Sequence, residues 1–171
     1  MTAFDPDYSP PAGLSSLLSG LLATTHERHM DMIALVTGLP ESGLTWAAGA
    51  DAAHISGLTM HILEVEEHLA HLAAGDEVHW AGKNGSSMDV VADEKTLIAR
   101  ITEVDVALKR AIERIPPERL ERHAPGNERT IGAALVEDLD HCAMHYGQLQ
   151  LTRHFYELAH PRFESRYEHW R

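Results

Sequence analysis

Two histidines four residues apart are the feature of this sequence best suited to chemistry. They lie in the segment His141-Cys-Ala-Met-His145-Tyr-Gly-Gln148, within a helix that we expect to run from about Thr130 to Leu158. On a helix, residues i and i+4 share one face and lie about 5–6 Å apart. Both imidazoles can therefore bind one first-row metal ion, at about 2.0–2.1 Å per nitrogen for zinc.

The spacing alone does not identify a metal site, because the chain has 13 histidines and some pairs four apart arise by chance. The competing interpretation is a helix with two histidines at its polar edge. At about 100° per residue, however, His141, His145 and Asp138 lie on the flank of an apolar stripe, so we expect them to face a partly buried groove. Unpartnered histidines in a core are unfavourable, and a metal is one way to satisfy them. The stripe consists of Ile131, Leu135, Cys142, Tyr146 and Leu149.

A third metal ligand must come from another part of the chain. We expect a second helix from about Ala52 to Ala74, capped by Asp51. The apolar stripe of this helix consists of Ile55, Leu58, Ile62, Val65, Leu69 and Leu72. Along one edge of the stripe, a histidine recurs every seven residues, at His54, His61 and His68. Neighbours in this series lie about 10.5 Å apart along the helix axis. One ion can therefore take only one of these three histidines.

Two further amphipathic segments complete an all-α pattern. We expect helices from about Leu14 to Thr37 and from about Val90 to Ile115, with apolar residues at helical spacing. The first of these carries His26 and His29 beside charged neighbours, and we interpret both histidines as part of a solvated face. Four such helices with connections of about 14 residues predict a four-helix bundle.

Composition limits the classes of protein that this chain can belong to. At 171 residues, with 44% hydrophobic and 23% charged residues, we expect one globular domain over 1–171, with an N-terminal arm at 1–12 and a tail at 159–171. The net charge of −12 disfavours nucleic acid or an anionic membrane surface as a partner. The single cysteine, Cys142, excludes an internal disulfide, and with no visible signal peptide or membrane span we expect a cytoplasmic protein.

Two tryptophans lie in the connections between the predicted helices. Trp46 follows a stretch rich in glycine and proline, and we expect it to close the end of the bundle core rather than to cover a site. Trp80 lies in a connection from 75 to 89 that can form the rim of a site at one end of a bundle. The sequence does not assign it a role.

The two histidine segments together resemble the DinB-like (DinB/YfiT) family of metal-binding four-helix bundles. In that family a Leu-x-Trp segment and a helix precede the first histidine ligand, as Leu44-Thr-Trp46 precedes His61 here. The second family segment reads roughly His-x-x-x-His-x-Gly-Gln and is followed by a late arginine. The residues that match it in order are His141, His145, Gly147, Gln148 and Arg153. The likeness runs from the first helix to about residue 158.

The resemblance implies an up-down-down-up bundle that is often paired into a homodimer. It implies that His61, His141 and His145 bind one divalent ion, with water in the open positions and nickel, zinc, iron or manganese as candidates. It also implies a small-molecule substrate, because the better-understood relatives are thiol-dependent transferases and isomerases that use mycothiol, bacillithiol or glutathione. Two departures bear on the substrate more than on the metal: Trp46-Ala-Ala-Gly replaces a more charged or proline-bearing run, and Tyr146 replaces a frequent basic residue.

The resemblance leaves several functions open. An open three-histidine site lowers the pKa of a bound water or thiol, which suits thiol transfer or metal-assisted hydrolysis. The family likeness implies a thiol-dependent S-transferase, with a metal-dependent hydrolase as an alternative. A non-enzymatic, stress-associated binding protein with a structural or vestigial metal is the other alternative, and a fourth protein ligand would favour it. A di-iron carboxylate bundle is disfavoured, because it needs Glu-x-x-His on two helices and only Glu157-x-x-His160 fits.

The residues around the histidines have less definite roles. Glu64, Asp138 and Tyr146 are candidates for handling protons or for orienting the metal ligands. Solvent exposure is the default expectation for Glu64, which lies about one turn beyond His61. Cys142 lies on the apolar side of its helix, so we expect a core residue rather than a nucleophile.

Overall fold

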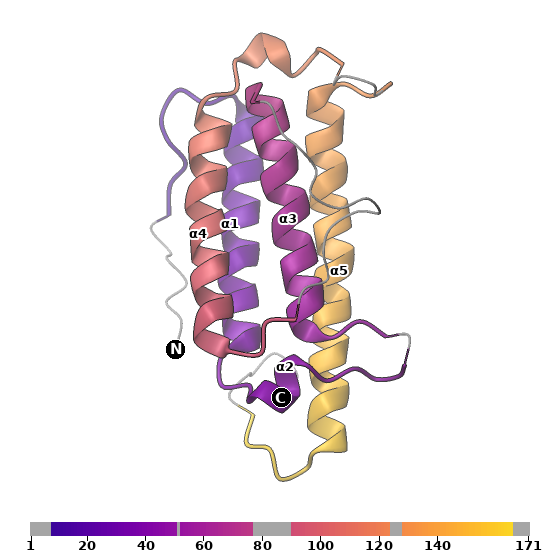
Figure 1. The fold of residues 1–171 in the computed structure, drawn as a ribbon. Helices are drawn as coiled ribbons and strands as arrows, with labels where there is room; N and C mark the ends of the chain where they lie inside the picture. The colour runs from indigo at the N-terminus through magenta and orange to yellow at the C-terminus, as the bar shows by residue number, and fades with distance from the viewer. Residues whose placement is uncertain (1–7, 51, 77–89, 124–127, 166–171) are drawn as a thin grey trace.

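In the computed structural model, which describes residues 8–50, 52–76, 90–123 and 128–165, four long helices lie side by side (Figure 1). A short helix lies between the first two long ones, and a 3₁₀ turn, η1 (Pro117–Arg119), precedes the last. The all-α bundle is confirmed, and each long helix begins and ends within four residues of its predicted bounds. The helices are α1 (Ser16–Val36), α2 (Glu41–Leu44), α3 (Ile55–Ala74), α4 (Glu94–Glu113) and α5 (Ile131–Ala159).

Side chains at the helix starts accept hydrogen bonds from backbone N–H groups that have no partner within the helix. Thr130 caps the start of α5, because its hydroxyl accepts from the Ala133 N–H at 3.2 Å. The predicted cap of α3, Asp51, is wrong. This helix starts later, and His54 Nδ1 accepts from the Gly57 N–H at 2.8 Å. His54 therefore caps the N-terminal end of α3 and is not a member of a candidate metal site.

Each of α4 and α5 packs against both α1 and α3. The C-terminal ends of α3 and α4 meet, because Arg114, just after α4, pairs with Asp76, just after α3, at 2.7 Å. These two helices therefore run in the same direction. The start of α4 instead meets the end of α1, where the Gly38 N–H donates to Glu94 at 3.1 Å. Helix α1 is therefore antiparallel to α4. In Figure 1, α5 lies beside α3 and runs in the opposite direction. This arrangement brings the middle of α3 against the middle of α5.

The core between the helices follows the predicted stripes on α5 but not on all of α3. All five residues of the α5 stripe are buried. On α3, Leu63, Glu66, Ala70 and Ala73 are buried, whereas the predicted Val65, Leu69 and Leu72 are only partly buried. The difference arises because α3 packs between α4 and α5, so its buried face is set by both neighbours. None of the described helices is long and apolar enough to cross a membrane.

Aromatic residues close the end of the bundle near α2. The Trp46 ring meets Tyr156 and His160 edge-on, with ring centroids 6.0 and 6.4 Å apart. Trp46 is partly buried against the core, which confirms its predicted role at the end of the bundle. Trp80, in the connection from 75 to 89, lies outside the described residues.

Arg153, the late arginine of the sequence motif, joins α5 to α1. Its side chain is fully buried, and its guanidinium donates to the backbone carbonyls of Leu35 and Thr37 at the end of α1. It also donates to Glu157 at 2.9 Å. Carbonyls in the last turn of a helix lack intrahelical donors and favour a cation. Arg153 thereby fixes how far α5 extends past α1.

A candidate three-histidine metal centre

Helices α3 and α5 bring three of the predicted histidines to one point. The Nε2 atom of His61 lies 3.1 Å from His141 Nε2, and His145 Nε2 lies 3.0 Å from the same atom. Ligand atoms of all three residues lie within 4.8 Å of one another. His68, the third member of the heptad series on α3, does not belong to this group.

The separations of the nitrogens fit a metal ion. Two neighbouring nitrogens bound at about 2.0–2.1 Å lie roughly 2.8–3.4 Å apart, from octahedral to tetrahedral geometry. Burial, followed by the neighbouring histidines, lowers the pKa of His61 and of His141. The neutral imidazole is thereby favoured near neutral pH, and this is the form that can bind a metal. The three residues present could hold a divalent ion.

Gln148, part of the sequence motif, contacts the outer nitrogen of His145. Its Oε1 lies 2.8 Å from His145 Nδ1. A carbonyl oxygen accepts hydrogen bonds, so this contact places the proton on Nδ1 and leaves the lone pair on Nε2. The lone pair then points toward the other two histidines. A glutamine three residues after a ligand on the same helix therefore selects the tautomer that can bind a metal.

The outer nitrogen of His141 lies in a different environment. His141 Nδ1 is buried and has no hydrogen-bond partner in the part of the chain that the structure describes. Asp138 Oδ1 lies 4.0 Å away, and this oxygen accepts from the Cys142 thiol at 3.6 Å. Burial, reinforced by the nearby carboxylate of Glu66, raises the pKa of Asp138 to about 7. Burial also raises the pKa of the Cys142 thiol, with the same two carboxylates adding to the effect.

Asp138, His141 and Cys142 form a second group with ligand atoms close enough for one ion. It is the weaker candidate, because a metal binds the thiolate and the raised pKa of Cys142 keeps the proton on sulfur. The thiol is also 2% exposed, which confirms Cys142 as a core residue. The three-histidine group needs no such deprotonation.

The two remaining candidates from the sequence are Tyr146 and Glu64. The Tyr146 ring is buried on the apolar stripe of α5, and the Arg28 guanidinium lies over it, 4.4 Å from its centroid. Tyr146 therefore belongs to the core of the bundle. Glu64 is half-buried on α3 and belongs to neither group of possible ligands.

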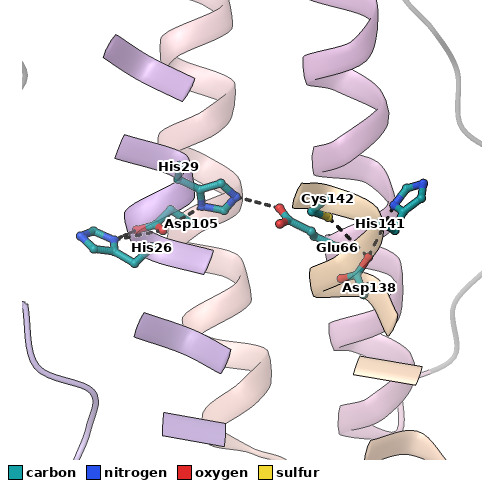
Figure 2. A network of polar contacts seen from close by, with 7 residues as sticks. All are labelled: His26, His29, Glu66, Asp105, Asp138, His141 and Cys142. Carbon is teal, nitrogen blue, oxygen red and sulfur yellow. Dashed lines mark hydrogen bonds and ion pairs between the residues drawn. The ribbon is translucent and has the colours of Figure 1, made fainter. Parts of the chain in front are cut away.

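A buried polar network, shown in Figure 2, contradicts the prediction that His26 and His29 belong to a solvated face. His29 is 0% exposed. Its Nε2 lies 2.7 Å from Glu66 Oε2, and its Nδ1 lies 2.9 Å from Asp105 Oδ1. His26 also bonds Asp105, at 3.0 Å, and its ring stacks on Tyr8 with centroids 3.9 Å apart.

The charge of His29 follows from these contacts. Burial alone would lower its pKa, but the carboxylates of Glu66 and Asp105 outweigh burial and raise the pKa to about 9. His29 is therefore a cation at neutral pH, bonded to a carboxylate on each side. The sequence does contain a signal for its burial. Leu22, Thr25, His29 and Met32 lie three or four residues apart, so the buried stripe of α1 passes through the histidine.

The network extends across the bundle toward the three-histidine group. Figure 2 shows one set of contacts that joins Asp105 on α4, His29 on α1 and Glu66 on α3, and a second set among Asp138, His141 and Cys142 on α5. The two sets are coupled electrostatically, because the Glu66 carboxylate raises the pKa of both Asp138 and Cys142. A small cavity of about 10 Å³ adjoins both Glu66 and Asp138, which is room for about one water molecule. All four long helices therefore contribute a polar side chain to the region behind His141.

Comparison with protein families places these residues in a known group. A profile of the DinB superfamily matches residues 24–149. The matched range includes His61, His141 and His145, together with all of α3 and α4. Comparison with curated proteins gave no match.

The buried histidine makes the stability of the fold depend on pH. Its folded pKa of about 9 lies above the ordinary 6.5, so its stabilisation is complete below pH 6.5 and is lost as the pH rises through 9. We expect the free energy of unfolding, measured with urea on chelator-treated protein, to fall by about 2–3 kcal/mol between pH 6.5 and 9. In Glu66→Gln the fall should be less than half as large, because the main attractive charge is gone.

Glu67→Gln is the matched control for this experiment. Glu67 neighbours Glu66 on α3 but pairs with Arg100 at the surface, at 2.6 Å. The control should retain the full loss of stability between pH 6.5 and 9. A wild-type stability that is flat over this interval, or an undiminished loss in Glu66→Gln, would contradict a cationic His29.

Proposed function

The chain belongs to the DinB superfamily, and we propose that it is a metal-dependent enzyme that transfers a low-molecular-weight thiol to an electrophilic small molecule. The observation that carries this proposal is the approach of His61 Nε2 and His145 Nε2 to His141 Nε2, at 3.1 and 3.0 Å. Superfamily membership supports the choice of thiol transfer by analogy, since a fold hosts many activities.

The three histidines would hold one divalent ion, with nickel, zinc, iron and manganese as the candidates. An ion held in this way lowers the pKa of a bound water or thiol toward neutrality. Gln148 maintains the His145 tautomer that presents a lone pair. The surrounding protein thus contributes three neutral donors, and the negative charge of a thiolate would be balanced by the metal.

The number of ligands favours an enzyme over a structural metal site. Structural zinc sites usually close with four protein ligands, whereas catalytic sites keep a position open. Among the described residues, the group of possible ligands at this point has three members. An open position is what a water or thiol requires. A metal-dependent hydrolase and a non-enzymatic binding protein remain the alternatives that the experiments below separate from thiol transfer.

The proposal predicts the metal content of the purified protein. Untagged wild-type protein should contain about one divalent ion per chain by elemental analysis. His61→Ala and His145→Ala should each lose it, since two imidazoles rarely hold a divalent ion against dilution. His68→Ala is the matched control, because it removes a half-buried histidine from the same edge of α3, and it should retain the metal. Wild-type protein that stays empty after reconstitution with all four metals would refute the site.

The proposal also predicts a thiol-dependent reaction. Metal-loaded wild-type protein should accelerate the addition of glutathione, mycothiol or bacillithiol to electrophilic acceptors. The rate is measured as the loss of free thiol. His145→Ala should lose this acceleration and His68→Ala should keep it. Hydrolysis of ester or amide probes without added thiol would instead support the hydrolase alternative. Metal binding with neither activity would support a binding protein.

We further propose that the protein forms a homodimer through the outer face of α5. This face exposes several large apolar side chains. Monomeric proteins rarely expose large contiguous apolar patches, and such patches often mark interfaces. A second copy of the same helix face would cover them. The exposed residues are Val136, Met144, Leu151, Phe155 and Leu158.

The dimer can be tested by light scattering on wild-type protein and on Leu151→Glu. Wild type should have twice the mass of one chain, and the charged variant should be monomeric, because a buried unpaired carboxylate is unfavourable. Val106→Glu, at an exposed apolar residue of α4, should leave the dimer intact. A monomeric wild-type protein would exclude this interface.

A further inference from the structure

The two histidines of α5 differ in what surrounds their outer nitrogens. His145 Nδ1 lies 2.8 Å from the carbonyl oxygen of Gln148, three residues later on the helix. His141 Nδ1 lies 4.0 Å from a carboxylate oxygen of Asp138, three residues earlier. Both partners lie one helical turn from their histidine, on opposite sides along the axis. Only the contact of His145 is within hydrogen-bonding distance.

We infer that Asp138 is the positioning residue of His141: when the three histidines bind a metal, the Asp138 carboxylate accepts a hydrogen bond from His141 Nδ1–H and fixes the ring. This inference rests on the proposed metal site. Histidine ligands almost always donate their second ring nitrogen to a carboxylate, a carbonyl or water. His141 Nδ1 is buried and has no partner in the described structure, so it needs an acceptor once Nε2 is bound to an ion.

Asp138 is the acceptor that the geometry offers. Its side chain is 11% exposed, so it is held near His141 by the protein rather than free in solvent. Cys142, its neighbour one turn further along, approaches the same carboxylate as a donor at 3.6 Å and does not compete for the His141 proton. Shortening the 4.0 Å separation to a hydrogen bond of about 2.8 Å needs only a small rotation of one side chain.

Glu66, the other buried carboxylate in this region, already has a different partner. Its Oε2 is bonded to His29 at 2.7 Å, and His29 is held from its other side by Asp105 at 2.9 Å. Glu66 is therefore anchored toward α1. Its charge adds to the negative potential behind His141, which favours a cation on the far side of the imidazole. Asp138 is therefore the carboxylate that accepts the hydrogen bond from His141 Nδ1–H.

The inference predicts a specific loss of metal affinity. The dissociation constant for Zn²⁺ can be measured by competition with a chromophoric chelator, using the full-length apo protein. Removal of an outer partner of a histidine ligand typically weakens metal binding by about 10–100-fold. We expect Asp138→Asn, which keeps one carbonyl acceptor, to lose roughly tenfold and Asp138→Leu, which keeps none, to lose roughly a hundredfold.

Asp140→Asn is the matched control, because Asp140 is an exposed aspartate next to His141 on the outer side of α5. It removes the same charge without facing Nδ1, so its zinc affinity should stay within about twofold of wild type. Circular dichroism of each apo variant checks that the helices are intact. The visible spectrum of the Co²⁺-loaded protein supplies a second readout, since a released ring changes the ligand field in Asp138→Leu but not in Asp140→Asn.

The outcomes separate this inference from the proposed function. If wild type binds Zn²⁺ and folded Asp138→Asn and Asp138→Leu bind it equally well, Asp138 does not position His141 and the metal site stands. Two ions per chain, with a thiolate-to-cobalt band that is lost in Cys142→Ser, would also overturn the inference, because Asp138 would then be a ligand. If wild type binds no metal, both the proposed function and this inference fail.

Discussion

Three imidazole nitrogens directed at one point are the constraint on which the rest of this structure depends. At separations of 3.0–3.1 Å, their lone pairs repel one another unless a proton or a cation lies between them. One of the three comes from α3 and two from α5, so a shift of either helix by a single residue would separate them. The bundle must therefore hold α3 and α5 in one register. Burial of the apolar stripe of α5 and the anchoring of Arg153 on the end of α1 both serve this requirement.

The polar network behind the histidines is a second means of fixing the register. Close-packed apolar side chains already resist sliding, and a buried ion pair adds a contact with one favourable geometry. His29 is bonded to Glu66 on α3 and to Asp105 on α4, so three helices meet at one cation. Breaking such a buried pair typically costs about 3–5 kcal/mol. A network of this kind opposes any sliding of α3, and α3 carries His61.

Sequence reasoning recovers the helices and two of the three histidines from local pattern alone. The apolar stripe and the i, i+4 spacing on α5 depend only on helix geometry, and both hold in the structure. The choice of His61 over His54 and His68 needed the family resemblance, because the heptad spacing makes the three equivalent. Their difference is tertiary: His54 caps the helix, whereas His61 lies level with the middle of α5.

The buried network escaped sequence reasoning for a physical reason. A charged or ionisable residue is usually exposed, so His29 beside Glu27 and Arg28 resembled a solvated face. Its burial depends on carboxylates 37 and 76 residues away in the chain, and no local pattern encodes such pairs. Gln148 was recognised only as a motif residue. Its contact with His145 follows from helix geometry, since residues three apart share a face.

The most direct test of the central claim is the X-ray absorption spectrum of the metal in the loaded wild-type protein. The account predicts about three imidazole nitrogens at about 2.0–2.1 Å, with the remaining positions filled by oxygen and no sulfur in the first shell. Fewer than two imidazoles, or a sulfur at about 2.3 Å, would contradict it. A sulfur would place the ion against Cys142 instead of among the three histidines.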